Sequence, residues 1–553
     1  MLFSFHGALA RLRGCSAAIR SLVLLSLSVS FANAQPSTPD TVRFLEQSTF
    51  GPNSALIAHV QAIGFPAFLQ EQFMTPASGY PALPLQPTKT PTTCTGICVT
   101  QNYTMYPVQV TFFQNALTAS DQLRQRVAFA LQQIMVASGL TVTQPSWMTP
   151  YLQIFSNNAF GNFRTLLGDI TLNPAMGEYL NMAGNNKNAP NENYGREVLQ
   201  LFSIGLNLLN PDGSVVTDSS GQPIPSYTQS IVDAFSRIFT GWNLAAAKTS
   251  PSPCSTATPC PDYLDPMALT VGNHDFRAET VLNGTVIPAQ TATAANANAQ
   301  LNAALDNIFN HPNVGPFIAR NLIEHLVTGN PSPAYISRVA STFNNDGTGT
   351  RGNLQAVVQS ILLDPEARTS PVSPLFGHLQ EPVLFTCRLL RAFNTGSATS
   401  DFVLSDSFLP SGLQMSEDLF RSPSVFNFYP PVNSIVAAPG IVINGPEYSI
   451  QSTSTALARI NFVAEVTYHT MPVSSPTRPT GTWLDLSAFT PLASNPSQLI
   501  AALNNLLMHG QASSALLTTV ANALASMSGA SSLAITQRAV YLFGSSSEYS
   551  VER

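Results

Sequence analysis

The sequence contains few charged residues. Asp, Glu, Lys and Arg make up only 10% of its 553 residues, and the formal net charge is −6 at pH 7. It has no basic run and no stripe of basic and aromatic residues, which argues against nucleic acid or an anionic membrane as a partner. Asn, Gln, Ser and Thr must therefore supply most of the polar surface.

Several common catalytic motifs are also missing. The sequence has no G-x-S-x-G elbow, no H-E-x-x-H helix and no phosphate-binding P-loop. The usual hydrolase, zinc-protease and nucleotidase interpretations therefore lose their normal support. No apolar run approaches the roughly 20 residues that a membrane-spanning helix needs, so we expect no integral membrane segment.

The N-terminal residues predict export. Arg11, Arg13 and Arg20 precede an apolar run over residues 22–31, and small residues follow at Ala32 and Ala34. This order is typical of a cleavable signal peptide over residues 1–34. We therefore expect a secreted or periplasmic protein whose mature chain begins at Gln35.

Four of the cysteines that follow the expected signal peptide form two close pairs, which are Cys94 with Cys98 and Cys254 with Cys260. In an oxidising compartment this spacing favours local disulfides that pin loops. A zinc site is the alternative, but the pairs lack nearby histidines and the usual short spacing. Cys387 lies in an apolar stretch and is expected to be a buried free thiol.

The hydrophobic periodicity is mostly helical. Leu123, Val127 and Leu131 recur at four-residue steps, which places them on one helical face. Two turn signals, Asn283-Gly284 and a second within residues 206–227, predict short β-hairpins. The fold class is therefore expected to be mainly α, a multi-helix globular body with minor β-hairpins. Two short helices are expected over residues 41–73, and further helices near residues 121–138, 317–326, 335–343, 354–363, 499–508, 514–525 and 535–543.

A change in composition suggests the domain organisation. A Pro-, Ser- and Thr-rich stretch over residues 471–482 resembles a linker or a long surface loop. We expect one helical domain over residues 35–470 and a C-terminal helical segment, residues 483–553, packed on it.

The densest polar cluster is Asn191-Glu192-Asn193, with Arg196 and Glu197 close behind. One interpretation is a capped helix in which Glu192 and Arg196, four residues apart, form a structural ion pair. The other is an oxygen-rich pocket that binds a hard cation or a polyhydroxyl ligand. We favour the first, because buried ion pairs also perturb titration without performing chemistry.

His274 and Asp275 could serve as a proton-transfer pair. Adjacent side chains on an extended segment point in opposite directions, so each would need another partner, such as Arg277 or the Glu192 cluster. Trp242 belongs to an aromatic group that could stack on a sugar, although buried packing is its commoner use. The candidate catalytic residues are Glu192, Arg196, Glu197, His274 and Asp275, and the candidate ligand-binding residues are Asn191, Asn193 and Trp242.

Many short segments together resemble one known family. They occur in a characteristic order over nearly the whole mature chain: Arg43-Phe44-Leu45, Asn173-Pro174-Ala175-Met176, the block at 191–205, Phe239-Thr240-Gly241-Trp242, His274-Asp275 and Ser422-Pro423-Ser424-Val425-Phe426. The chain is similar to the secreted bacterial family catalogued as domain of unknown function number 1800. The resemblance implies a helical exported protein and, as a partner, a companion secreted protein that resembles sulfatases.

The chain departs from many members of that family in the helix expected at residues 121–138. Where they carry a histidine-containing aromatic segment, this sequence has Phe129-Ala130-Leu131-Gln132-Gln133. We therefore predict no metal or haem site that depends on that histidine.

Two functions follow as hypotheses, and the sequence identifies no cofactor for either. The first, favoured by the missing motifs and the weakly charged surface, is a non-catalytic extracellular binding or assembly protein. The second is a metal-dependent or carboxylate-based hydrolase of unrecognised type, centred on Glu192, Arg196, Glu197 and His274.

Overall fold

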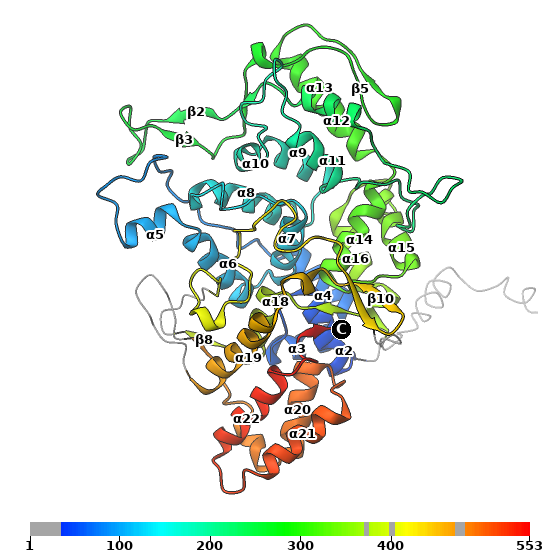
Figure 1. Ribbon diagram of the computed structural model, residues 1–553. Helices are drawn as coiled ribbons and strands as arrows, with labels where there is room; N and C mark the ends of the chain where they lie inside the picture. Colours follow the sequence, from blue (N-terminus) through cyan, green and yellow to red (C-terminus); the bar gives the residue numbers. More distant parts are fainter. Residues whose placement is uncertain (1–34, 370–374, 398–403, 470–481) are drawn as a thin grey trace, which may run out of the picture. The chain divides into compact units, whose positions relative to one another are not determined.

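Helices dominate the computed structural model, which describes residues 35–369, 375–397, 404–469 and 482–553 (Figure 1). The expected signal peptide and nearly all of the expected linker lie outside these residues. The described part contains 21 α-helices: α2 (Thr38–Ser48), α3 (Ser54–Ile63), α4 (Phe65–Met74), α5 (Ile97–Tyr103), α6 (Tyr106–Thr118), α7 (Gln122–Ile134), α8 (Pro145–Asn158), α9 (Phe163–Leu172), α10 (Pro174–Tyr179), α11 (Asn193–Gln200), α12 (Gln229–Ile238), α13 (Ala294–Phe309), α14 (Val314–Leu326), α15 (Pro333–Asn344), α16 (Leu354–Leu363), α17 (Pro365–Arg368), α18 (Pro382–Ala392), α19 (Thr453–Tyr468), α20 (Pro496–Met508), α21 (Ser514–Ala525) and α22 (Ser532–Gly544).

Local sequence explains many of the helix boundaries. The Ser332 side chain accepts a hydrogen bond from the Tyr335 amide and so caps the N-terminus of α15. Residues 38–74 form three helices where the sequence suggested two, because Gly64, with φ +81°, ends α3 and directly precedes α4. Helix α7 begins one residue after Asp121 and ends at Ile134, four residues before the expected end at Ser138.

The strands form only two-stranded antiparallel ribbons. The pairs are β1 (Trp242–Asn243) with β4 (Ala268–Leu269), β2 (Ala245–Lys248) with β3 (Cys260–Asp262), β5 (Glu279–Thr280) with β6 (Val286–Ile287), β7 (His378–Leu379) with β12 (Val551–Glu552), β8 (Gly396–Ser397) with β11 (Thr482–Trp483) and β9 (Ser434–Ala438) with β10 (Ile441–Asn444). The mainly helical class with minor hairpins is confirmed. The predicted hairpin at Asn283-Gly284 is the β5–β6 pair.

Residues 206–227 form an irregular ribbon, called here the 206–227 ribbon. It reverses direction twice and is held by single bridges such as Leu209 with Val215 and Thr217 with Pro223. The sequence indicated a single hairpin there. Asp218 accepts the amides of Ser220 and Gln222, which stabilises the second turn.

The helices from Ser37 to Arg553 share one core. Helices α14, α15 and α16 pack in sequence, and α14 also contacts α7. In the C-terminal region, α20 packs on α2, and α22 packs on α19 (Figure 1). None of the helices in the described part of the chain is long and apolar enough to cross a membrane.

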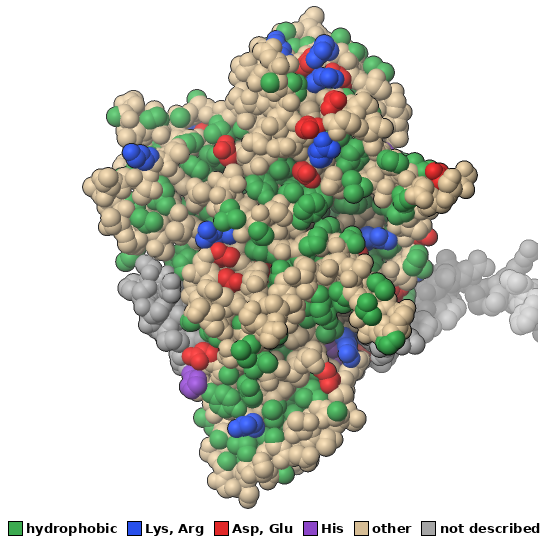
Figure 2. Space-filling model, in the orientation of Figure 1, with side chains coloured by type: hydrophobic (Ala, Val, Ile, Leu, Met, Phe, Trp, Pro, Cys, Tyr) green, Lys and Arg blue, Asp and Glu red, His purple; other side chains and the backbone are tan. Residues whose placement is uncertain are grey.

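Both predicted cysteine pairs lie at disulfide distance. The Cα atoms of Cys94 and Cys98 are 5.2 Å apart, and those of Cys254 and Cys260 are 5.4 Å apart. Cys387 is a buried free thiol, as expected. On the face drawn in Figure 2, charged side chains are scattered among uncharged ones, in keeping with the low charge of the sequence.

A close backbone approach joins β12 to the rest of the molecule. Gly377, with φ +100°, precedes β7, and a Cβ added to it would collide with the carbonyl oxygen of Glu552. The ribbon of β7 and β12 therefore requires glycine at this position.

We expect Gly377→Ala to lower the free energy of unfolding by at least about 1 kcal/mol more than Gly349→Ala, measured by urea denaturation. Gly349 has a similar φ of +96° but no atom within 4 Å of the added Cβ, so its variant carries only the backbone strain of about 1–2 kcal/mol. Equal losses in the two variants would show that the contact with Glu552 does not constrain the fold.

Candidate functional site

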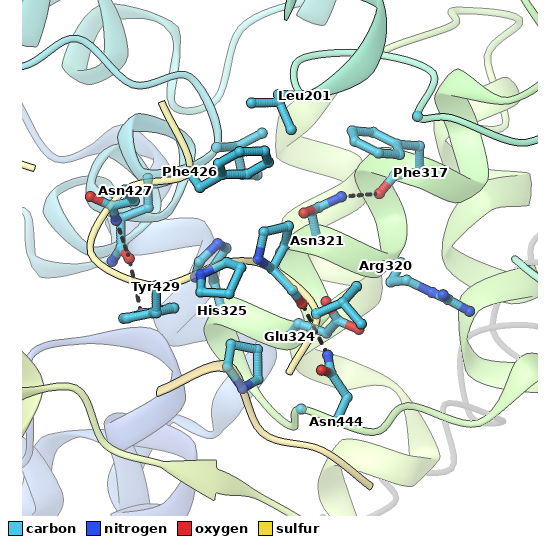
Figure 3. A pocket seen from close by; sticks show the side chains of 18 of the residues that line it. Leu201, Phe317, Arg320, Asn321, Glu324, His325, Phe426, Asn427, Tyr429 and Asn444 are labelled. Carbon is cyan, nitrogen blue, oxygen red and sulfur yellow. Dashed lines mark hydrogen bonds between the residues drawn. The ribbon is translucent and has the colours of Figure 1, made fainter. Parts of the chain in front are cut away.

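A cavity with a volume of about 660 Å³ lies beside α14. Its walls come from α14, the 206–227 ribbon, the end of α7, and residues 425–447, called here the 425–447 segment (Figure 3). This volume is within the range of small-molecule sites in proteins.

Helix α14 presents one face to the cavity. Phe317, Arg320, Asn321, Glu324 and His325 line it, at the three- and four-residue steps that place side chains on one side of a helix. On the opposite side Ile318, Leu322 and Leu326 are fully buried in the core. The apolar packing of that second face therefore fixes the direction of the polar one.

Glu324 and His325 are partly buried side chains that have no partner. None of the hydrogen bonds or ion pairs within the described residues involves the Glu324 carboxyl or the His325 ring. Burial raises the pKa of Glu324 to about 8, although the charge of Arg320 opposes this. Burial lowers the pKa of His325 to about 3, and Arg126 and His378 lower it further. At pH 7 the carboxyl is mainly protonated and the imidazole is neutral.

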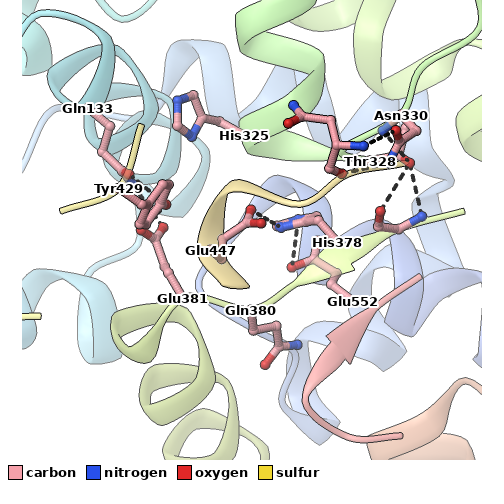
Figure 4. A network of polar contacts seen from close by, with 12 residues as sticks. Gln133, His325, Thr328, Asn330, His378, Gln380, Glu381, Tyr429, Glu447 and Glu552 are labelled. Carbon is pink, nitrogen blue, oxygen red and sulfur yellow. Dashed lines mark hydrogen bonds and ion pairs between the residues drawn. The ribbon is translucent and has the colours of Figure 1, made fainter. Parts of the chain in front are cut away.

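A buried network of polar side chains adjoins the cavity, and Gln133, Tyr429 and Glu447 belong to both (Figure 4). The Gln133 Nε2 donates to Glu381 Oε1 at 2.8 Å, and the Tyr429 hydroxyl donates to Glu381 Oε2 at 2.8 Å. Gln133 Oε1 accepts from Asn427 Nδ2 at 3.1 Å. Burial raises the pKa of Glu381, while its hydrogen bond to Gln133 and the charge of Arg126 oppose the increase.

A second part of the network joins β7, β12 and the 425–447 segment. His378 Nδ1 lies 3.2 Å from Glu447 Oε1, and its Nε2 lies 3.8 Å from Glu552 Oε2. Burial alone would lower the pKa of His378, but Glu447 and Glu552 raise it. Burial raises the pKa of Glu552 to about 7. The Arg126 guanidinium donates to the carbonyl oxygen of His325, which connects this network to α14.

The cluster at 191–197 lies outside the lining of this cavity. Arg196 Nη2 and Glu192 Oε2 form the expected ion pair, at 2.8 Å, on the surface of α11. Glu197 Oε2 is buried without a hydrogen bond, and burial raises the pKa of this carboxyl. Asn191 and Asn193 are exposed, and Asn191 Oδ1 accepts the amide of Asn193 in a local turn.

His274 and Asp275 have separate partners. His274 is buried, with Nδ1 2.7 Å from the carbonyl oxygen of Thr240 and Nε2 3.0 Å from Gln300 Oε1. Burial tends to raise the pKa of Asp275, but its hydrogen bonds from Arg277 lower it. Trp242 is buried in β1. Within the described residues, no hydrogen bond or ion pair joins His274 to Glu192 or Glu197.

The described residues contain no group of three or more His, Cys, Asp and Glu side chains arranged to hold a metal ion. The cavity residues Glu324 and His325 were not among the predicted site residues. In the sequence they belong to a group of polar residues, Arg320 to His325, that recur at helical spacing. The sequence alone cannot distinguish such a group from the solvent-facing side of a helix.

Comparison with known proteins gives one match. A family model described as a protein of unknown function, DUF1800, matches residues 43–551. No curated protein and no solved structure matches the chain.

The buried Glu324 carboxyl predicts a pH dependence of stability. Its pKa is higher in the folded chain, about 8, than the ordinary value of 4.5, so the folded state holds a proton that the unfolded state releases between these values. The free energy of unfolding of the wild type, relative to Glu324→Gln, should therefore fall from about pH 5 to about pH 8 and then level off.

Urea denaturation at steps of one pH unit measures this difference. Glu178→Gln, which removes an exposed carboxyl of α10, is the control and should leave the wild-type profile unchanged. Parallel profiles for the wild type and Glu324→Gln would contradict a raised pKa at Glu324.

Proposed function

The chain belongs to the DUF1800 family, and we propose that it is an exported binding protein that holds an uncharged organic ligand in the cavity beside α14. One observation carries the proposal. Two ionisable side chains, Glu324 and His325, line the cavity with no hydrogen-bond or ion-pair partner among the described residues, and burial keeps both of them mainly uncharged at neutral pH. A neutral carboxylic acid and a neutral imidazole each offer one hydrogen-bond donor and at least one acceptor.

The rest of the lining supports a ligand that is partly apolar. Leu201, Ile204 and Phe317 supply apolar contacts, and Asn321 and Asn207 supply amide groups (Figure 3). The mixture of apolar walls and a few polar groups is typical of small-molecule sites. Arg320 is the cation of the lining, and its Nη2 donates to the carbonyl oxygen of Gly213.

The location outside the cytoplasm is part of the proposal. The signal-like residues 1–34 and the two cysteine pairs at disulfide distance support it. The low surface charge and the absence of the common catalytic motifs support binding as the role.

Glu324 and His325 also favour a second candidate function, a carboxylate-based hydrolase. A carboxyl whose pKa lies near neutrality can donate a proton to a leaving group, and His325 is adjacent to it. In this hypothesis the proton donor is Glu324 of α14, and not a carboxyl of the 191–197 cluster that the sequence suggested.

We expect a library of neutral compounds that combine apolar and hydroxyl or amide groups to contain ligands that raise the melting temperature of the protein. Leu201→Trp should weaken their binding by at least about tenfold in calorimetric titration, because the indole would occupy the cavity. The control is Leu517→Trp, a similarly half-buried leucine of α21 that does not line the cavity.

Equal affinities for the two tryptophan variants would contradict the proposed site. Each ligand that binds is also incubated with the wild type and with Glu324→Gln. Turnover that is present in the wild type and lost in a folded Glu324→Gln that still binds would establish the hydrolase in place of the binding protein.

Expression of the full chain in a bacterial host tests the export. Mass spectrometry should find a mature protein that begins at Gln35 outside the cytoplasm. After unfolding without reductant, alkylation should modify one thiol, that of Cys387. An intact cytosolic precursor with every thiol reduced would refute this part of the proposal.

A further inference from the structure

Large apolar side chains surround the mouth of the cavity. Leu206, Val215, Phe426 and Val432 all line it, and yet their side chains are 58%, 39%, 41% and 71% exposed. A side chain that lines a cavity and also contacts solvent lies at its opening. These four residues, called here the apolar rim, come from the 206–227 ribbon and from the 425–447 segment.

The apolar rim continues beyond the cavity mouth. No charged residue occurs from Ser422 to Pro446, and Val436 and Val442 of the β9–β10 hairpin are 73% and 63% exposed. Hydrophobic side chains gather near the centre of the face in Figure 2, where Figure 1 places α14 and β10. Monomeric proteins rarely expose contiguous apolar surface of this kind unless it contacts a ligand or a partner.

The same cavity also has polar lining residues. Within the described part of the chain, no hydrogen bond or ion pair involves the Glu324 carboxyl or the His325 ring, and both side chains line the cavity from α14 (Figure 3). Glu447 Oε2 is also buried without a hydrogen bond, whereas the Tyr429 hydroxyl is bonded to Glu381. The cavity therefore combines an apolar rim with a few polar groups that are free to bind a ligand, two of them on α14.

We propose that the ligand is a neutral amphiphile, whose uncharged polar head binds Glu324 and His325 and whose alkyl chain leaves the cavity across the apolar rim. This inference rests on the proposed binding function and adds the chemical class of the ligand. A small polar ligand without a chain would leave the rim in water. A fatty acid or other anionic amphiphile would bury its charge beside a neutral carboxyl and a neutral imidazole, away from water.

A series of alkyl glucosides tests how the binding affinity depends on the length of the alkyl chain. The full mature chain is titrated with butyl, hexyl and octyl glucoside, each below its micelle-forming concentration. Affinity should rise about fourfold for each CH₂ group that the rim covers. Octanoate at pH 7 should bind more weakly than octyl glucoside, and the reverse order would overturn the neutral head group.

Substitution of the apolar rim distinguishes the contribution of the alkyl chain to affinity from that of the head group. In the triple variant Leu206→Ser, Phe426→Ser and Val432→Ser, the gain per CH₂ should fall below twofold, while butyl glucoside keeps its wild-type affinity. The matched control is Val286→Ser, Leu264→Ser and Leu457→Ser, three exposed apolar residues outside the cavity lining, which should retain the fourfold gain. Circular dichroism and melting curves show whether each variant is folded.

The outcomes distinguish the two proposals. Neutral ligands that bind in a manner sensitive to Leu201→Trp, but with no dependence on chain length, would overturn the amphiphile and leave the binding function standing. A chain-length dependence that survives in the rim variant would also overturn it. Failure of the whole neutral library to bind would remove the binding function itself.

Discussion

The cavity depends on one buried polar face of α7. Arg126 and Gln133 lie seven residues apart, two helical turns, and so point in similar directions. Arg126, fully buried, donates to the carbonyl of His325, and Gln133 binds Glu381 and Asn427. A hydrogen bond to a charged group contributes about 1.5–3 kcal/mol, so these contacts hold α14 and the 425–447 segment in place relative to each other.

Desolvation decides the chemistry of this region. Arg320 carries positive charge nearby, and yet burial outweighs its attraction at Glu324 and raises the pKa of this carboxyl. The same effect acts at Glu552 and Glu381. Two of the ionisable residues that line the cavity, Glu324 and His325, are therefore mainly uncharged at pH 7, which is the property on which the proposed uncharged ligand depends.

The sequence predicted much of the fold because the signals are local. Four-residue apolar spacing located α7, a two-residue turn located β5 and β6, and short cysteine spacing located both disulfides. The site could not be located in this way. Glu324 differs from an ordinary surface carboxyl because it lines a cavity. The other walls of that cavity include the 425–447 segment and the 206–227 ribbon, which are distant from Glu324 in the sequence. The residues singled out as a cluster, Glu197 and His274, instead have their own local surroundings.

The wide sequence separation of the contacts around β7 has a kinetic consequence. His378 meets Glu447 and Glu552, and Gln133 meets Glu381 and Asn427, so each contact closes a long loop of chain. Proteins rich in such non-local contacts have high contact order and fold slowly. We therefore expect the cavity to be assembled late, after the locally determined helices, and we expect the partly folded chain to expose apolar surface with little charge to oppose self-association.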